Sequence, residues 1–243
     1  MIIKSATYLT SVVNKENILN DGIDFAFVGR SNVGKSSLIN SLVNQKKLCK
    51  TSSTPGRTRM INYFLINNEF RFVDLPGYGY AQAGKEHKLI WANIMEDYLV
   101  NTKALKRVFM LVDGRIAPTE LDVRMLKFLF YYQIPTTIIA TKCDKLPKSK
   151  ITTYMQNIAK KLNVGKDNIL PYSSENGFNK DKVLSIIEQD LKDWLKIVYI
   201  FMIYTTKSLN SRKRRILLSC RLNLDFFVFK VEKANKISYK LSL

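Results

Sequence analysis

The chain has 243 residues, 46% of them hydrophobic, which is enough to bury one sizeable core and too few to expect several domains. Lysine and arginine outnumber aspartate and glutamate by 39 to 20, so the formal net charge is +19. A surplus of this size favours a polyanionic partner, either nucleic acid or a membrane surface. A basic surface that contacts only water would give the same count, so charge alone does not choose between them.

Cysteine and histidine usage argues against two classes of protein. Cys49, Cys143 and Cys220 are widely spaced and His87 is the only histidine, so neither a disulfide framework nor a zinc site is expected. The first seventeen residues lack the features of a signal peptide. The longest apolar run, residues 197–204, is much shorter than the ~20 residues that span a bilayer. We therefore expect a soluble cytoplasmic protein with no membrane span.

Short apolar runs alternate with helical patterns along the chain. Strands are predicted at residues 23–28, 61–66, 69–74, 107–113, 135–141 and 168–173, and helices at 36–45, 85–100, 120–132, 148–162 and 182–195. Asn67 and Asn68 predict a two-residue hairpin turn between the second and third strands. This order predicts an α/β fold with a six-stranded, mainly parallel sheet, helices on both faces and one antiparallel edge strand.

Composition changes after Leu195. Residues 196–243 contain 11 Lys/Arg and two acidic residues, so they carry +9 of the net charge and residues 1–195 carry +10. Apolar and basic runs mix there without a clear period, and we assign this segment no structure. We treat residues 1–195 as one domain and residues 196–243 as a basic extension, which is either an RNA-binding segment or an anomalous C-terminus.

A phosphate-binding loop follows the first predicted strand. Its sequence matches G-x-x-x-x-G-K-[ST] with Gly29, Arg30, Ser31, Asn32, Val33, Gly34, Lys35 and Ser36. Glycine lets the backbone turn so that successive N–H groups face phosphate oxygens, and the following helix N-terminus adds a favourable dipole. Lys35 would reach the β- and γ-phosphates, and the Ser36 hydroxyl would bind Mg²⁺. The alternative is a chance Gly-rich turn, but the preceding strand and following helix favour the functional interpretation.

Two further segments point to guanine. The run Thr141, Lys142, Cys143 and Asp144 follows a later strand, where a carboxylate can accept both N1–H and the exocyclic amine of guanine. The Lys142 stem can cover the base face, and Cys143 is expected to be a small packing residue. After the last strand, backbone N–H groups in the run Ser173, Ser174 and Glu175 could meet the guanine O6, and Tyr172 is also expected at the nucleotide. A P-loop ATPase or kinase is the alternative, and Asp144 argues against it.

Two loops are predicted to respond to the third phosphate. Asp74, Leu75, Pro76 and Gly77 end a strand, where Asp74 can hold Mg²⁺ through water and the Gly77 N–H can meet a γ-phosphate. A second loop contains Gly56, Arg57, Thr58, Arg59 and Met60, and Thr58 is its best candidate for a further Mg²⁺ ligand. Ordinary turn chemistry would also explain a threonine in a Gly/Pro loop.

These segments together resemble one protein family. GRSNVGKSSLIN, STPGRTR, FVDLPGYGYA, LVDGRIAPTELD and TKCDKL are similar to the EngB (YihA/YsxC) family of bacterial ribosome-biogenesis GTPases, over about residues 1–195. The resemblance implies a single Ras-like domain that binds GTP and GDP with Mg²⁺ and hydrolyses GTP slowly. It further implies a switch in assembly of the large ribosomal subunit, contacts with rRNA and not DNA, and a role in cell division and septation. A monomer is expected.

Several residues allow more than one interpretation. Tyr78 stands where Ras-like proteins carry the glutamine that orients the attacking water, so no general base is identified, and Lys35 and Thr58 are the catalytic candidates. Asn32 either helps to hold potassium or suits a tight loop. Arg57 and Arg59 could each act as an arginine finger. Solvated loop arginines or arginines that contact RNA are the favoured interpretation of both residues. A passive RNA-binding module with structural GTP and a membrane-surface GTPase are the remaining alternatives.

Overall fold

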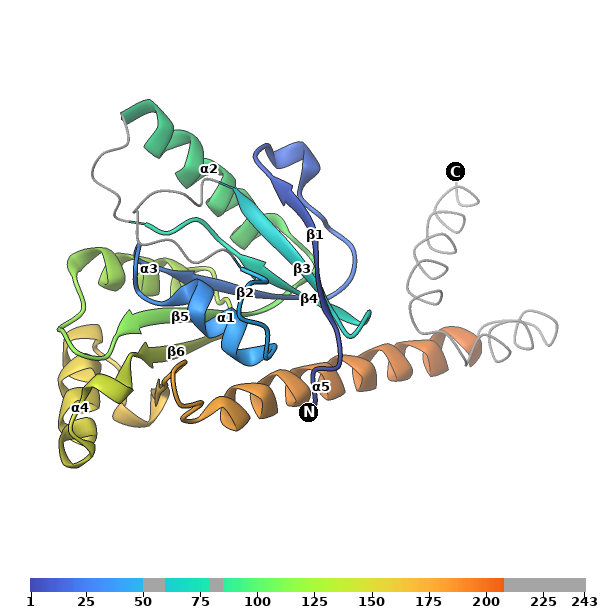
Figure 1. Ribbon diagram of the computed structural model, residues 1–243. Helices are drawn as coiled ribbons and strands as arrows, with labels where there is room; N and C mark the ends of the chain where they lie inside the picture. Colours follow the sequence, from blue (N-terminus) through green and yellow to red (C-terminus); the bar gives the residue numbers. More distant parts are fainter. Residues whose placement is uncertain (50–59, 79–84, 208–243) are drawn as a thin grey trace. The chain divides into compact units, whose positions relative to one another are not determined.

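The structure is a computed structural model that describes residues 1–49, 60–78 and 85–207, without the side chains of residues 85–91 and 199–207 (Figure 1). Two compact units follow each other along the chain, Met1–Ile186 and Ile187–Leu243. Every strand among the described residues belongs to the first unit. In the second unit the described residues form the later part of one helix, α5 (Lys180–Lys207).

The first unit is built on a seven-stranded sheet in the order β1-β3-β4-β2-β5-β6-β7. Its strands are β1 (Ala6–Val12), β2 (Asp24–Gly29), β3 (Ile61–Ile66), β4 (Phe70–Asp74), β5 (Leu105–Asp113), β6 (Thr136–Thr141) and β7 (Ile169–Pro171). Strands β4, β2, β5, β6 and β7 are parallel to one another, whereas β1–β3 and β3–β4 pair antiparallel. The predicted α/β fold with a mainly parallel sheet is confirmed.

The strand count differs from the six predicted because β1 was missed. This strand lies at the sheet edge and pairs only with β3, with an irregular register between Tyr8 and Thr10. Its middle residues are exposed, so it lacks the clean alternation of apolar and polar side chains that identifies a half-buried strand. Because β1 covers it, β3 is an interior strand and not the edge strand that we predicted.

The predicted hairpin turn between β3 and β4 is confirmed. Asn67 and Asn68 have φ values of 52° and 56°, the left-handed conformation that both central residues of a tight hairpin turn adopt. The Asn67 side chain also accepts hydrogen bonds from the N–H groups of Lys4 and Ser5 at 2.7 and 3.2 Å. The turn therefore also anchors the start of the chain beside the sheet.

Four helices complete the first unit: α1 (Lys35–Leu42), α2 (Lys85–Asn101), α3 (Glu120–Tyr131) and α4 (Ile151–Leu162). A reciprocal capping box between Thr119 and Asp122 begins α3, and Asn163 with φ 55° ends α4. All four helices are confirmed to within three residues at either end. The first three residues predicted for α4 form a separate turn, Lys148–Lys150. Helix α5 continues past Leu195 to Lys207, so helical structure does not stop where the composition changes.

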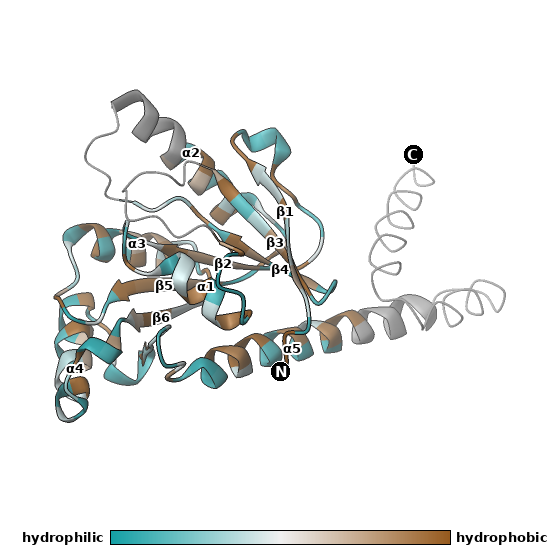
Figure 2. Cartoon of the chain, viewed as in Figure 1, coloured by the Kyte–Doolittle hydropathy of each residue, from teal (hydrophilic) through white to brown (hydrophobic). Residues whose placement is uncertain are grey.

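The core lies on both faces of the sheet. Along β2, Phe25 and Phe27 point to one face and Ala26 and Val28 to the other, and all four are fully buried. Helices α2, α3 and α4 cover the face of Ala26, while α1 lies on the opposite side (Figure 1). Figure 2 shows the central strands as mostly hydrophobic, as expected for parallel strands buried on both faces. Among the helices of the described residues, none combines the length and apolar character needed to cross a membrane.

Candidate functional site

Most of the predicted motifs gather at the carboxyl ends of the parallel strands. Strand β2 ends at Gly29, β4 at Asp74 and β6 at Thr141. The loop that follows β2 leads directly into α1, whose first residue is Lys35. Because these strands are parallel neighbours through β5, their ends meet at one edge of the sheet, where ligands of α/β proteins commonly bind.

The loop at residues 29–36 needs its small and flexible residues. A Cβ on Gly29 would lie 2.8 Å from a methyl group of Val33 and 2.9 Å from the Leu111 carbonyl, so no larger residue fits. Gly34, at the helix N-cap, has φ 103°, which L side chains rarely adopt. Asn32 has φ 63°, a conformation that asparagine tolerates better than most residues. This conformation fits the tight-loop interpretation of Asn32 and does not test the potassium interpretation.

Lys35 and Asp74 form a buried ion pair across the site. The Cys49 thiol lies 3.7 Å from Asp74 Oδ2 and also contacts the Ser36 side chain. Burial, followed by the Asp74 charge, raises the pKa of Cys49, so this residue stays a neutral thiol. The Ser36 hydroxyl and Asp74 carboxylate therefore lie near one another and present the hard oxygen donors that suit Mg²⁺. No cluster of three His, Cys, Asp or Glu side chains able to bind a metal occurs among the described residues.

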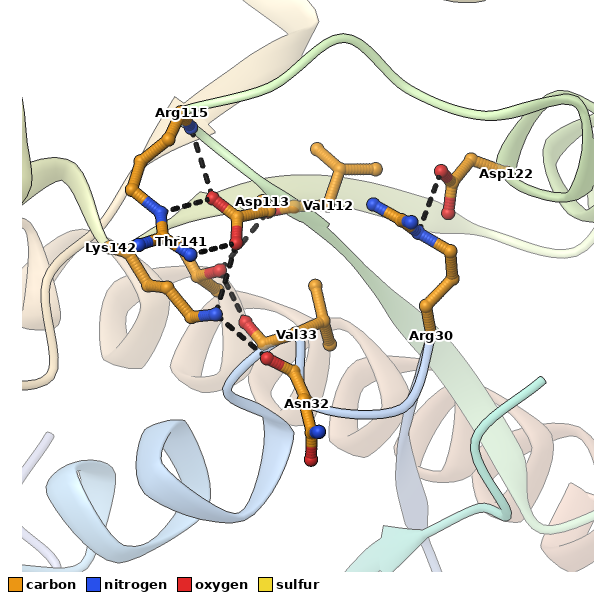
Figure 3. A network of polar contacts seen from close by, with 9 residues as sticks. All are labelled: Arg30, Asn32, Val33, Val112, Asp113, Arg115, Asp122, Thr141 and Lys142. Carbon is orange, nitrogen blue, oxygen red and sulfur yellow. Dashed lines mark hydrogen bonds and ion pairs between the residues drawn. The ribbon is translucent and has the colours of Figure 1, made fainter. Parts of the chain in front are cut away.

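The Thr141–Asp144 segment is fastened to the loop at residues 29–36 (Figure 3). The Thr141 hydroxyl donates to the Val33 carbonyl at 2.6 Å, and Lys142 Nζ donates to the Asn32 carbonyl at 2.7 Å. The sequence predicted that the Lys142 stem covers a base, whereas the structure adds that its ammonium group orders the phosphate-binding loop. These contacts connect a predicted base-binding segment with a predicted phosphate-binding segment.

Asp113 is a site residue that the sequence analysis missed. Its carboxylate accepts hydrogen bonds from Lys142 Nζ at 3.0 Å and from the Arg115 side chain at 2.8 and 2.9 Å. Burial raises the pKa of Asp113, but these hydrogen bonds outweigh it and hold the value at about 2. Its position, the last residue of β5, was the available signal, because other strands of this sheet end in the predicted motifs.

Asp144 remains a charged acceptor at the same edge. Ser173 Oγ donates to its carboxylate at 2.8 Å, and Lys145 lies 3.1 Å away. Burial opposes ionisation, but the hydrogen bonds from Ser173 and Lys145 lower the pKa of Asp144. The backbone N–H groups of Tyr172 and Ser173 donate to Ala140 and Phe178 carbonyls, so these two cannot serve the predicted role toward a base oxygen. Ser174 is left as the candidate donor.

Other predicted residues have plain structural positions. Cys143 is buried, as expected of a packing residue. Leu75 is buried too, and its N–H donates to the Phe27 carbonyl. Met60 is exposed at the start of β3. Gly56, Arg57, Thr58 and Arg59 lie outside the described residues, as does the basic run Arg212, Lys213, Arg214 and Arg215.

Gly77 and Tyr78 lie directly against the phosphate-binding loop. The Ser31 N–H donates to the Tyr78 carbonyl, and the Tyr78 N–H donates to the Gly29 carbonyl, both at 3.3 Å. The Tyr78 hydroxyl donates to Asp122 at 2.8 Å, a contact that the sequence did not predict. The segment that begins at Asp74 therefore contacts the phosphate-binding loop through Lys35 and through Tyr78.

Known GTP-binding proteins are similar to this chain. Residues 24–142 match the family described as 50S ribosome-binding GTPase. A Clostridium kluyveri protein named "Probable GTP-binding protein EngB" is 50% identical over 190 residues, which cover 77% of this chain and 96% of the relative. The Bacillus subtilis protein of the same name is 41% identical over 191 residues, which cover 78% of this chain and 98% of the relative.

Solved structures of GTP-binding proteins are also similar to this chain. The crystal structure of a probable GTP-binding protein engB is 27% identical with a TM-score of 0.58, and the match covers 70% of this chain and 99% of that one. Aquifex aeolicus Era bound to GDP.AlF4- is 26% identical with a TM-score of 0.56, over 68% of this chain and 55% of that one.

Proposed function

Since the chain belongs to the EngB family of GTP-binding proteins and is a GTPase, we propose that it acts as a nucleotide-controlled switch in assembly of the large ribosomal subunit. In this role it would be a cytoplasmic monomer needed for normal cell division and septation. The division into a GTPase domain at residues 1–195 and a basic extension at 196–243 is part of the proposal.

In the proposed site, the residues at the strand ends hold GTP or GDP. The N–H groups of the loop at residues 29–36 cradle the phosphates, and Lys35 would leave Asp74 to pair with phosphate oxygens. Ser36 and Asp74 fit Mg²⁺, with Thr58 as the further proposed ligand. Bound Mg²⁺ would neutralise charge on the phosphate oxygens during hydrolysis. Asn32 is the candidate for a potassium ligand.

Guanine recognition is assigned to Asp144. Its lowered pKa keeps a charged acceptor for the two guanine donors, and Ser173 fixes one of its oxygens at 2.8 Å. Adenine presents the opposite donor and acceptor pattern, so its binding would leave the carboxylate mismatched. The same residue therefore argues for GTP over ATP.

The observation that carries the switch is the contact between the Asp74–Tyr78 segment and the phosphate-binding loop. Asp74 pairs with Lys35, and Tyr78 exchanges two backbone hydrogen bonds with the loop. A third phosphate would need the same lysine and would approach the same backbone, so its presence would alter this segment. Nucleotide state would thus reach the half-buried residues Gly77 and Tyr78 through contacts that already exist.

The ribosomal partner is supported by charge and by the family description. Residues 1–195 carry +10, so phosphate contacts with rRNA do not require the basic extension. The family is described as ribosome-binding, and specifically as binding the 50S subunit. The alternative is a passive RNA-binding module in which GTP is structural, and it predicts the same charge but no response to nucleotide.

Co-sedimentation with large ribosomal subunits across a salt titration separates these two functions. We expect tighter binding with a non-hydrolysable GTP analogue than with GDP, by about tenfold, a usual size for coupling between two sites. Affinity should also fall with salt, with a slope of about −0.7 to −0.9 per phosphate contact. Equal binding in both nucleotide states would support the passive module.

Two variants sharpen the measurement. Thr58→Ala should remove the nucleotide difference and keep the salt-sensitive binding, because it takes away the proposed Mg²⁺ ligand outside the phosphate-binding loop. Thr7→Ala is the matched control, since Thr7 is exposed on the edge strand β1. A nucleotide difference that survives in Thr58→Ala would contradict the role assigned to Thr58.

A further inference from the structure

Asp122 joins three segments of the first unit. It is fully buried in the first turn of α3, where its Oδ2 accepts hydrogen bonds from Thr119 N at 2.7 Å and Thr119 Oγ1 at 2.8 Å. Its Oδ1 accepts the Tyr78 hydroxyl at 2.8 Å. Arg30 Nε lies 3.1 Å from Oδ2 as an ion pair, without the alignment of a hydrogen bond (Figure 3).

The helix cap explains only part of this arrangement. A capping box needs one carboxylate oxygen at the N-cap N–H, and Thr119 supplies that contact. The contacts with Tyr78 and Arg30 come from segments outside α3 and add nothing to the cap. A buried carboxylate with an arginine and a tyrosine as further partners therefore has a second role.

Tyr78 is held at both its side chain and its backbone. Burial, followed by the Asp122 charge, raises the pKa of Tyr78, so its hydroxyl stays protonated and donates. Its carbonyl accepts the Ser31 N–H and its N–H donates to Gly29. The preceding Gly77 packs so closely that an added Cβ would lie 3.1 Å from Ser31 N. Asp122 thus fixes the side chain of Tyr78, and the backbone of Tyr78 is hydrogen-bonded to the phosphate-binding loop.

We propose that Asp122 is a positioning residue for nucleotide selection, which holds Tyr78 against the phosphate-binding loop and thereby favours GDP over GTP. Backbone N–H groups in this loop are the donors that face phosphate, and the Ser31 N–H is engaged by the Tyr78 carbonyl. A third phosphate must compete with the Tyr78 carbonyl for the Ser31 N–H, whereas GDP carries no third phosphate. The inference rests on nucleotide binding and is independent of the proposed ribosomal role.

The test is the ratio of two dissociation constants in the full chain, one for GDP and one for a non-hydrolysable GTP analogue, both measured with Mg²⁺. Tyr78→Phe removes only the hydroxyl that Asp122 accepts. We expect it to shift the ratio toward the GTP analogue by about fivefold to tenfold, the net contribution of a typical hydrogen bond. Affinity for GDP should change by less than about twofold, because GDP does not compete with Tyr78.

Tyr8→Phe is the matched control. The Tyr8 hydroxyl makes a 2.7 Å hydrogen bond to Ser11 on the edge strand β1, so the same atom is lost at a distant place. It should leave the ratio unchanged. A ratio in Tyr78→Phe equal to that of the wild type would overturn the proposal, whatever the ribosome experiment shows.

Asp122→Ala removes the acceptor itself. It should shift the ratio in the same direction, and adding Tyr78→Phe to it should produce no further shift, because both changes remove the hydrogen bond between Tyr78 and Asp122. Two additive shifts would mean that Tyr78 acts without Asp122 and would overturn the assignment. If Asp122→Ala fails to fold, Tyr78→Phe and its control decide the question alone.

Discussion

The sheet buries an aspartate with an arginine and a tyrosine at each of its two ends. At the amino end of β2, Asp24 accepts Arg71 Nε at 2.6 Å and the Tyr98 hydroxyl at 3.1 Å. Its partners lie on β4 and α2, two elements of the hydrophobic core. This aspartate therefore joins parts of the chain that the backbone ladder and apolar packing already hold.

At the carboxyl end, Asp122 has the same kinds of partner in a different setting. Tyr78 and Arg30 lie just past the ends of β4 and β2, where a single backbone bridge joins them, and their side chains contact Asp122. Similar chemistry thus fastens the framework at one end and the loops beside the nucleotide at the other. Changes at Asp24 should alter stability, and changes at the contact between Tyr78 and Asp122 should alter nucleotide binding.

The strongest expected effect is at the amino end. Asp24→Ala leaves Arg71 buried without its main partner, which should lower the free energy of unfolding by about 3–5 kcal/mol near neutral pH. Denaturant unfolding measures this loss. The ratio of GDP to GTP affinity in the folded fraction should not change.

Asp21→Ala is the control for that variant. Asp21 also pairs with Arg71, at 3.2 Å, but its side chain is 70% exposed. An exposed pair contributes less than about 1 kcal/mol, so the loss should be small. Equal losses in the two variants would contradict the view that burial of Asp24 makes it structural.

The sequence predicted the motifs better than the contacts between them. Apolar runs that end in glycine or polar residues located Gly29, Asp74 and Thr141, because the same residues serve fold and chemistry. Asp113 and Asp122 were missed because the partners that connect them to the site, Lys142 for Asp113 and Tyr78 and Arg30 for Asp122, come from distant parts of the chain. In the local sequence, Asp122 looks like an ordinary helix-capping residue. Strand β1 was not predicted, because an edge strand whose middle residues are exposed shows no regular alternation of apolar and polar side chains.

A second comparison is between two carboxylates with opposite pKa shifts. Burial raises the pKa of Asp24 to about 6 despite the opposing hydrogen bonds from Arg71 and Tyr98. At the site, the hydrogen bonds of Arg115 and Lys142 overcome burial and hold the pKa of Asp113 at about 2. The charged form is disfavoured at the amino end and favoured at the carboxyl end.

Asp113 should therefore stabilise the fold above acid pH. A carboxyl group with a lowered folded-state pKa contributes stability that is complete above its unfolded value, 3.8, and is lost as pH falls through about 2. Asp113→Asn should cost up to about 2 kcal/mol at pH 7, and the difference from the wild type should shrink below pH 3.8. Urea unfolding at pH 7 and pH 3 measures both values. Asp167→Asn, in an exposed turn, is the control and should show no such difference.

The smallest expected effect separates two tyrosines beside Asp24. Tyr63 and Tyr98 are both fully buried, and their rings meet edge to face with centroids 6.3 Å apart. The Tyr98 hydroxyl donates to Asp24 at 3.1 Å, whereas the Tyr63 hydroxyl contacts the Leu19 backbone without hydrogen-bond geometry.

Removing one hydroxyl from each ring therefore isolates the hydrogen bond, since ring packing is kept in both variants. Tyr98→Phe should cost about 1 kcal/mol because it leaves a buried carboxylate oxygen with one donor fewer. Tyr63→Phe should change stability by less than about 0.5 kcal/mol, because it removes a buried polar atom that lacks a good partner. The midpoint of urea unfolding, compared between variants whose unfolding free energies depend equally steeply on urea concentration, gives both stability changes. A larger loss in Tyr63→Phe than in Tyr98→Phe would show that the Tyr63 hydroxyl contributes more than the hydrogen bond from Tyr98 to Asp24, and would contradict the view that this hydrogen bond fastens the framework.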